Sequence, residues 1–276
     1  MKELSLKETQ HISYEILKQV TAICEKINIR YCLIYGTLIG AIRHKGFIPW
    51  DDDLDIMMPR PDYERFLKYF KEHKSEYSFL ELFNKDENKD YPYMISRISD
   101  SRYEIKMDNE KSYGMGVFID IYPFDGLGNS KSEALKYGLK GDRLSSLCYQ
   151  ASRSYFSMET TTSLFRKLIK YPVYKISKWI GKDFFQEKLS KLENIKNFDS
   201  SEYAGCVVWL SGGERDIFKR KWFDETILWP FEDSFFRIPK NYDQVLKHTY
   251  GDYMKIPPKD EQIGHHYYKV YQKNDY

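Results

Sequence analysis

The residues best suited to chemistry in this chain are the aspartates of the run Trp50-Asp51-Asp52-Asp53-Leu54-Asp55-Ile56. Residues two apart on an extended chain share a face, so alternate aspartates should point one way while the apolar residues between them anchor the other face. Those aspartates are Asp51, Asp53 and Asp55, and the apolar residues are Leu54 and Ile56. Like charges this close are costly unless a cation neutralises them. Oxygen ligands at this density predict a site for Mg²⁺ or Mn²⁺ that leaves positions open for water and phosphate.

Two other interpretations of the acidic run remain open. A calcium loop of the EF-hand type would begin at Asp51 and place Asp62 at its twelfth position, but Ile56 stands where that loop needs glycine. A solvated acidic turn is the second alternative. The alternating apolar residues argue against it, because a solvated turn has no use for an apolar face.

A glycine and a threonine upstream predict a phosphate-binding turn. The β-favouring run 31–35 ends at Gly36, and Thr37 follows as an expected helix cap. Such a turn presents backbone N–H groups and a hydroxyl to a phosphate. The basic residues around Arg43 either bind phosphate oxygens or form an exposed helix end that the helix dipole favours.

Another carboxylate, Asp120, is the lone charge in the apolar run 117–122. Burying it without a partner would be expensive. An arginine such as Arg97 would satisfy it. Alternatively, Asp120 joins the metal cluster or takes a proton from an attacking hydroxyl.

The elements that must position these residues alternate between helix and strand. Apolar residues at intervals of three and four predict an amphipathic helix over 8–28, and further helices are expected over 61–73 and 242–249. Strands are expected over 31–35, 53–58, 79–83, 94–99, 103–107, 117–122, 206–210 and 235–238. The lysine-rich stretch 131–198 predicts long helices, broken at Tyr171-Pro172 and at Gly181.

Composition excludes several classes of protein. With 43 Lys and Arg against 41 Asp and Glu, a net charge of +2 argues against a nucleic-acid binder. The polar amino terminus and the absence of any apolar stretch near the roughly 18 residues of a membrane span favour a cytoplasmic chain without a transmembrane segment. The four cysteines lack zinc-type spacing, so we expect reduced, buried thiols. Aromatic residues, at 17%, suit ordinary packing, a ring-lined pocket or contact with a membrane surface.

Three segments resemble the signature of the LicD family, which includes the fukutin-type proteins. They are Tyr35 to Asp55 (YGTLIGAIRHKGFIPWDDDLD), Phe118 to Gly126 (FIDIYPFDG) and Tyr242 to Pro258 near the carboxyl terminus. The resemblance implies an α/β nucleotidyltransferase-like core over 1–126, with a small mixed β-sheet flanked by helices. The stretch 127–199 departs from the family pattern and is expected to form a helical insertion in which acceptor selection resides, and 200–276 is expected to be a C-terminal segment that completes the cleft.

The resemblance also implies roles for individual residues. In the superfamily pattern, a glycine and a small hydroxyl residue precede two acidic residues one apart, and a third acidic residue follows. The implied metal ligands are Asp53, Asp55, Asp120 and Asp51, of which the first three are the catalytic candidates. Asp120 is either a third ligand or the general base. The implied substrate-binding residues are Gly36, Thr37, Arg43 and Arg97.

The implied activity is Mg²⁺- or Mn²⁺-dependent transfer of phosphocholine, or a related phospho-alcohol, from a CDP-activated donor such as CDP-choline. The implied acceptor is a hydroxyl of a glycan or lipid-linked glycan, such as lipopolysaccharide, teichoic acid or capsule, reached at the inner face of the membrane. CDP-ribitol or another phospho-sugar donor is an alternative, as is a non-catalytic, metal-stabilised binding module. A choline headgroup would need an aromatic cage, for which Trp209, Trp222 and Tyr250 are candidates.

Overall fold

The computed structural model describes residues 1–109, 111–156, 164–209, 212–262, 264 and 268–274, and side chains in 164–169 are not described. Its main sheet has the strand order β2-β3-β7-β5-β4, and β8 and β9 extend it from β7. The strands are β2 (Cys32–Leu33), β3 (Asp55–Pro59), β4 (Leu80–Phe83), β5 (Ser96–Asp100), β7 (Phe118–Gly126), β8 (Tyr203–Gly205) and β9 (Phe218–Lys219). Strands β3 and β7 are parallel, whereas the other paired strands of this sheet are antiparallel. The expected mixed α/β architecture is confirmed.

Seven helices accompany this sheet in the described part of the chain. They are α1 (Leu6–Lys26), α2 (Tyr35–Ile39), α3 (Arg60–Glu72), α4 (Lys131–Ser152), α5 (Leu164–Ile180), α6 (Lys182–Ser190) and α7 (Tyr242–Tyr250). Helix α1 begins with a capping box, in which Ser5 Oγ accepts the Glu8 N–H and the Glu8 carboxylate accepts the Ser5 N–H. Its apolar stripe is buried, as the periodicity predicted.

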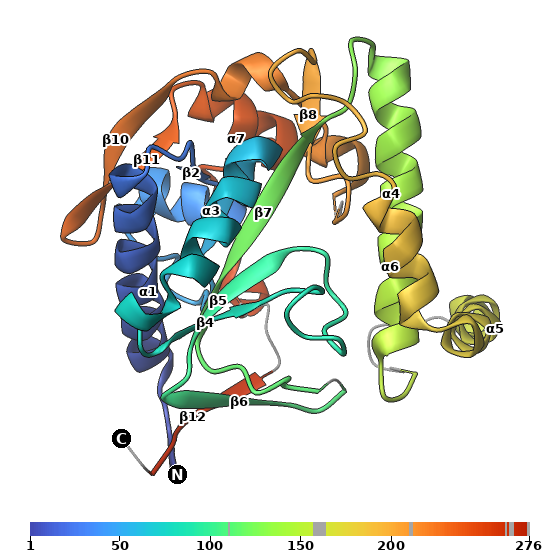
Figure 1. Cartoon of the computed structure of the whole chain (residues 1–276), viewed down its shortest axis with the longest axis horizontal. Coiled ribbons are helices and arrows are strands. Elements are labelled where there is room, and N and C mark those ends of the chain that lie inside the picture. The colour runs from blue at the N-terminus through green and yellow to red at the C-terminus, as the bar shows by residue number, and fades with distance from the viewer. Residues whose placement is uncertain (110, 157–163, 210–211, 263, 265–267, 275–276) are drawn as a thin grey trace.

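A second, three-stranded sheet joins the two ends of the chain. Strand β12 (Tyr268–Gln272) lies between β1 (Lys2–Glu3) and β6 (Tyr103–Met107), and both pairings are antiparallel. The sequence predicted β6 but neither of its partners in this sheet. A hairpin of β10 (Thr226–Phe231) and β11 (Ser234–Pro239) completes the strands. In Figure 1, β12 and β6 lie together near the chain ends, on the opposite side of the molecule from the hairpin.

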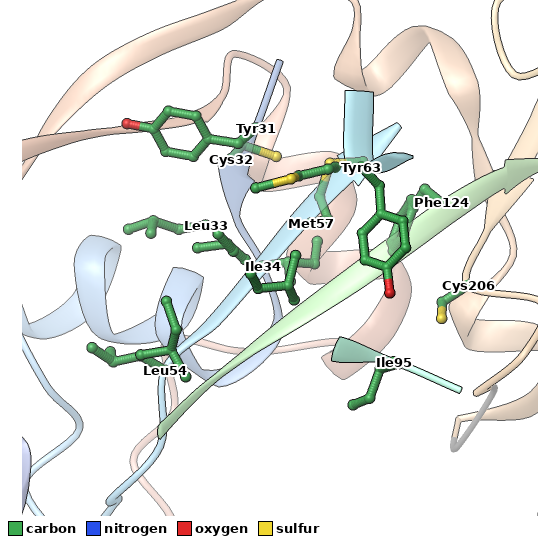
Figure 2. Packing of buried hydrophobic residues seen from close by; sticks show 14 of the residues in the cluster. Tyr31, Cys32, Leu33, Ile34, Leu54, Met57, Tyr63, Ile95, Phe124 and Cys206 are labelled. Atoms are coloured by element: carbon green, nitrogen blue, oxygen red, sulfur yellow. The ribbon is translucent and has the colours of Figure 1, made fainter. Parts of the chain in front are cut away.

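One hydrophobic core extends from the amino-terminal strands to the second half of the chain. Figure 2 shows Leu33, Leu54 and Met57 from the β2 and β3 region in one cluster with Phe124 of β7 and Cys206. All four cysteines are buried free thiols, as expected.

Helices α4, α5 and α6 stand apart from the main sheet as a column at the right of Figure 1. Gly141 of α4 allows this column to approach the residues that follow β8, because a Cβ at this position would lie 1.8 Å from the carbonyl oxygen of Val207. Ser145 Oγ, one turn later, donates a hydrogen bond of 2.6 Å to the Val208 carbonyl. The helical column is therefore anchored on the segment after β8.

Three local predictions are wrong. Residues 206–209 form a turn rather than a strand, since the Trp209 N–H donates to the Cys206 carbonyl and the apolar run packs on α4. The helix break at Tyr171-Pro172 is absent from the described residues, since α5 continues through Pro172 at an exposed position. The break at Gly181 is confirmed, with a φ of 88° that favours glycine. Finally, Thr37 lies inside α2, and Ile34 occupies the cap position.

Candidate metal and substrate site

The acidic run forms a loop that gathers three carboxylates. The ligand oxygens of Asp51, Asp52 and Asp53 all lie within 4.8 Å of one another. Strand β3 begins only at Asp55, so this gathering comes from the bend of the loop and not from the expected alternation along a strand. Asp52 was missed for this reason, because alternation placed it on the opposite face from its neighbours.

Backbone hydrogen bonds hold the acidic loop in place. The Asp51 carbonyl accepts Gln10 Nε2 of α1 at 2.7 Å, and the Asp51 N–H donates to the Ile48 carbonyl at 3.0 Å. At the other end of the loop, the Leu54 carbonyl accepts the Asp120 N–H at 2.9 Å. Asp51 is only 7% exposed, so the solvated-turn interpretation is wrong.

The EF-hand alternative also fails on geometry. Asp62, which would be its twelfth residue, lies in α3 and accepts Arg30 Nε at 2.6 Å. Arg65 binds the same carboxylate at 3.2 Å. Asp62 therefore belongs to an ion pair away from the acidic loop.

Asp55, Asp120 and Arg97 face one another across three neighbouring strands. Asp55 of β3 is in register with Asp120 of β7, and Asp120 is in register with Arg97 of β5. Side chains in register lie on the same face of a sheet, about 5 Å apart. Arg97 Nε donates to Asp120 Oδ1 at 2.6 Å, so the predicted partner of Asp120 is confirmed.

The surroundings of Asp55 place a negative charge where water is scarce. The residue is 5% exposed, and its Oδ1 has no hydrogen-bond partner within the described ranges. Burial, followed by the charges of Asp53 and Asp120, raises the pKa of Asp55 well above its usual range. A divalent cation would resolve this conflict, and the all-oxygen donor set with an unmatched buried oxygen fits a hard ion such as Mg²⁺.

The guanidinium group of Arg97 packs against two aromatic rings. Its guanidinium carbon lies 4.2 Å from the centroid of the Phe118 ring and 4.5 Å from that of the Tyr93 ring, and the residue is 7% exposed. Such contacts fix the direction in which Arg97 presents its charge to Asp120.

Gly36 and Thr37 contact the acidic residues directly. Thr37 Oγ1 accepts the Asp55 N–H at 2.7 Å, and this bond fixes the start of β3. A Cβ on Gly36 would lie 3.1 Å from Asp51 Oδ2, so the glycine lets α2 approach the acidic loop. Both residues therefore position carboxylates, whatever they bind in addition.

Arg43 reaches a different part of the chain. It lies in the π-helical turn Gly40–His44 that continues α2, and its Nη1 donates to the carbonyls of Tyr253 and Lys255, at 2.8 and 3.3 Å. Burial lowers the pKa of Arg43. The guanidinium thus ties the segment after α7 to the turn beside the acidic loop.

Four tyrosines come close to the carboxylates. Burial raises the pKa of each hydroxyl, and the negative charge of nearby aspartates raises it further. These aspartates are Asp55 and Asp120 for Tyr122, Asp52 and Asp53 for Tyr268, Asp55 and Asp216 for Tyr250, and Asp216 and Asp55 for Tyr35. The rings of Tyr35 and Tyr122 meet edge to face with centroids 5.0 Å apart. Tyr35 also has a φ of 51°, an uncommon conformation for this residue type that recurs at functional sites.

Sequence reasoning identified only Tyr250 among these tyrosines. Tyr35 and Tyr122 stood inside the motifs beside residues that were chosen, whereas Tyr268 carried no signal because β12 was not foreseen. Of the two tryptophan candidates for a choline cage, Trp209 packs against Tyr149 and against Tyr93, the ring that also contacts Arg97. Trp222 packs against His248.

This chain is similar in sequence to a known protein family and to individual proteins. Residues 28–143 match the profile of the LicD/FKTN/FKRP nucleotidyltransferase domain, so the match contains the acidic loop, Arg97 and Asp120. The lipopolysaccharide cholinephosphotransferase LicD of Haemophilus influenzae is 32% identical over 272 residues, which cover 98% of this chain and 99% of that protein. An uncharacterised protein of Rickettsia typhi is 32% identical over 148 residues, which cover 47% of this chain and 48% of its own length.

Proposed function

This chain belongs to the LicD family, and from that premise we propose that it transfers phosphocholine from CDP-choline to a hydroxyl of a lipopolysaccharide glycan. The observation that carries the proposal is the acidic cluster, which lies inside the matched nucleotidyltransferase domain with a buried oxygen of Asp55 unmatched. The proposed substrates follow the printed activity of the Haemophilus influenzae relative, to which the similarity extends over nearly the whole of both chains.

We assign Asp53 and Asp55 as the main ligands of Mg²⁺ or Mn²⁺, with Asp51 and Asp52 completing the acidic loop. The bound ion would neutralise charge on the donor diphosphate. Thr37 holds the backbone of Asp55, and Gln10 holds that of Asp51, so the carboxylates are positioned before any substrate arrives. Gly36 and Arg43 are the remaining candidates for contact with donor phosphates.

In the proposed reaction, the acceptor oxygen attacks the phosphorus that bears the choline, and the bond from this phosphorus to the CMP oxygen breaks. CMP leaves with the bonding electrons, and the hydroxyl proton passes to a base or to water. Asp120 either takes that proton or serves as a third ligand. In both roles Arg97 acts as a positioning residue, because it holds one oxygen of Asp120 at 2.6 Å.

The domain assignment is part of the proposal. We infer that 1–126 is the catalytic core, that 127–199 is a helical insertion for the acceptor and that 200–276 completes the cleft. Arg43 supports the last assignment because it binds the segment after α7. As a further part of the proposal, the protein works in the cytoplasm at the inner membrane face. No helix in the described ranges has the length and apolar character of a membrane span.

The test is donor turnover by the purified chain. We expect CMP release from CDP-choline with Mg²⁺ and lipopolysaccharide, a mass increase of the glycan by one phosphocholine, and no transfer with EDTA. Transfer from CDP-ribitol instead would establish the alternative donor. Failure with every CDP-alcohol and acceptor, in a protein that still binds Mg²⁺, would favour a non-catalytic binding module.

A further inference from the structure

The outer face of α5 exposes large apolar side chains to solvent. Trp179 is 87% exposed and Ile176 is 57% exposed. Among the described side chains of this helix, those buried against the molecule are Tyr174 and Ser177. Figure 1 shows α5 at the edge of the molecule, crossing the ends of α4 and α6.

Four of the exposed apolar residues form one continuous face, whereas Tyr171 lies on the other side of the helix, where its ring contacts Phe156 and Tyr174. With successive side chains about 100° apart around a helix, Val173, Ile176, Trp179 and Ile180 fall in an arc of roughly 120°. This arc points away from Tyr174 and Ser177. A water-soluble helix normally turns its apolar face toward the core, so this helix has the opposite orientation.

Basic residues outnumber acidic residues in α5 and in the residues around it. Helix α5 contains five Lys or Arg and no Asp or Glu. Residues 127–199 contain 14 Lys or Arg and 7 Asp or Glu, although the whole chain has a net charge of only +2. Around the helix axis, Lys175 borders the apolar arc next to Trp179, whereas Lys170 lies on the other side of the helix, between Ser177 and Tyr174. Basic residues therefore dominate the helix that carries the exposed apolar face.

We propose that α5 binds the surface of an anionic phospholipid bilayer, lying in the plane of the interface with Trp179 and Ile176 inserted among the lipids. A helix with a tryptophan-containing apolar face and lysines on its other face is typical of interfacial helices. A second copy of this chain is a poor occupant, because two such faces would bring like charges together. The inference concerns a surface other than the acidic site and does not depend on which group the enzyme transfers.

The test measures sedimentation of the full chain with vesicles, without donor or added metal. We expect binding to vesicles of phosphatidylglycerol and phosphatidylcholine, much weaker binding to pure phosphatidylcholine, and release as salt rises. The double substitution Ile176→Ser and Trp179→Ser should abolish binding. Replacing Lys175 by glutamine should weaken it about fivefold.

The matched control changes two apolar residues that are exposed elsewhere. Leu228 and Phe235 of the β10–β11 hairpin are 59% and 65% exposed, and their replacement by serine should leave vesicle binding unchanged. All these residues are exposed, so melting temperatures should not shift. Equal sedimentation with neutral and anionic vesicles, or unchanged binding of the α5 variant, would overturn the proposal. Dimers that form without lipid and disappear when Trp179 is replaced would instead identify a second copy as the occupant.

Discussion

Two buried aspartates of this fold should respond in opposite ways to the same substitution. Asp125 is fully buried, and its two oxygens accept Arg60 Nε at 2.8 Å and Arg60 Nη2 at 2.7 Å. Asp55 is also buried, but it lies among carboxylates and its Oδ1 has no partner in the described part of the chain. We expect Asp55→Asn to stabilise the metal-free protein and Asp125→Asn to destabilise it.

The magnitudes follow from these contacts. Two like charges about 5 Å apart repel by about 3 kcal/mol at an effective dielectric constant of 20, and the nearby charge of Arg97 offsets part of this. Asp55→Asn should therefore raise the free energy of unfolding by about 1–3 kcal/mol, or the melting temperature by roughly 2–10 °C. Asp125→Asn leaves the buried Arg60 with Glu193, at 3.6 Å, as its remaining counter-charge and should cost about 3 kcal/mol.

The stabilisation of Asp55→Asn should depend on pH in a defined direction. The pKa of Asp55 is raised in the folded state, whereas an unfolded aspartate titrates near pH 3.9. Below about pH 4 the carboxyl is protonated in both states, so its ionisation imposes no penalty on the fold. As the pH rises through the folded-state pKa, the wild-type protein loses this advantage. The gain from Asp55→Asn should therefore be small near pH 4 and largest at neutral pH.

The assay is thermal unfolding from pH 4 to 8 in EDTA, repeated with Mg²⁺. The divalent ion should raise the melting temperature of the wild-type protein, because it binds only the folded state, and should do so much less for Asp55→Asn. Transfer activity should be lost in Asp55→Asn even though it folds more stably. A metal-free Asp55→Asn protein that melts at or below the wild-type temperature at neutral pH would refute the electrostatic argument.

Three further predictions concern other contacts. Thr37→Val removes the acceptor of the Asp55 N–H and should lower stability by about 1–3 kcal/mol, with partial rescue by Thr37→Ser in the same unfolding assay. Asp120→Asn should reduce kcat strongly while calorimetry shows little change in CDP-choline affinity, and an equal loss of affinity would argue for a binding role. Gly141→Ala should destabilise by about 1–3 kcal/mol, because its methyl group would overlap the Val207 carbonyl, and an unchanged melting temperature would contradict that packing.

The sequence predicted those elements whose signal is local. The stripe of α1, the strands β3 and β7 and the lone charge of Asp120 all follow from periodicity over a few residues. The pairing of Asp120 with Arg97 was one of the alternatives left open by the sequence, since a buried charge needs a partner. Those local signals identified Asp55, Asp120 and Arg97, but not the loop that gathers Asp52 with Asp51 and Asp53.

The remaining features depend on contacts between distant parts of the chain. Strand β12 pairs with β6, although more than half of the sequence length separates the two strands. The residues of β12 do not indicate which strand will be its partner. The position of Tyr268 beside the acidic site was therefore not predicted. The apolar run 206–209 looked like a strand, but its burial against α4 is satisfied by a turn. Whether such a run forms a strand or a turn is decided by tertiary packing, which short-range sequence patterns do not encode.

The position of Thr37 changes how its place in the motif should be interpreted. A hydroxyl after a glycine turn suggests a phosphate ligand, yet here Thr37 Oγ1 accepts the N–H of Asp55. The same bond holds the first residue of β3, where the acidic loop joins the sheet. Loss of activity in a Thr37 variant would therefore not identify a phosphate contact. A phosphate role would require weaker donor binding in a variant that retains Mg²⁺ affinity, because displaced carboxylates would weaken both.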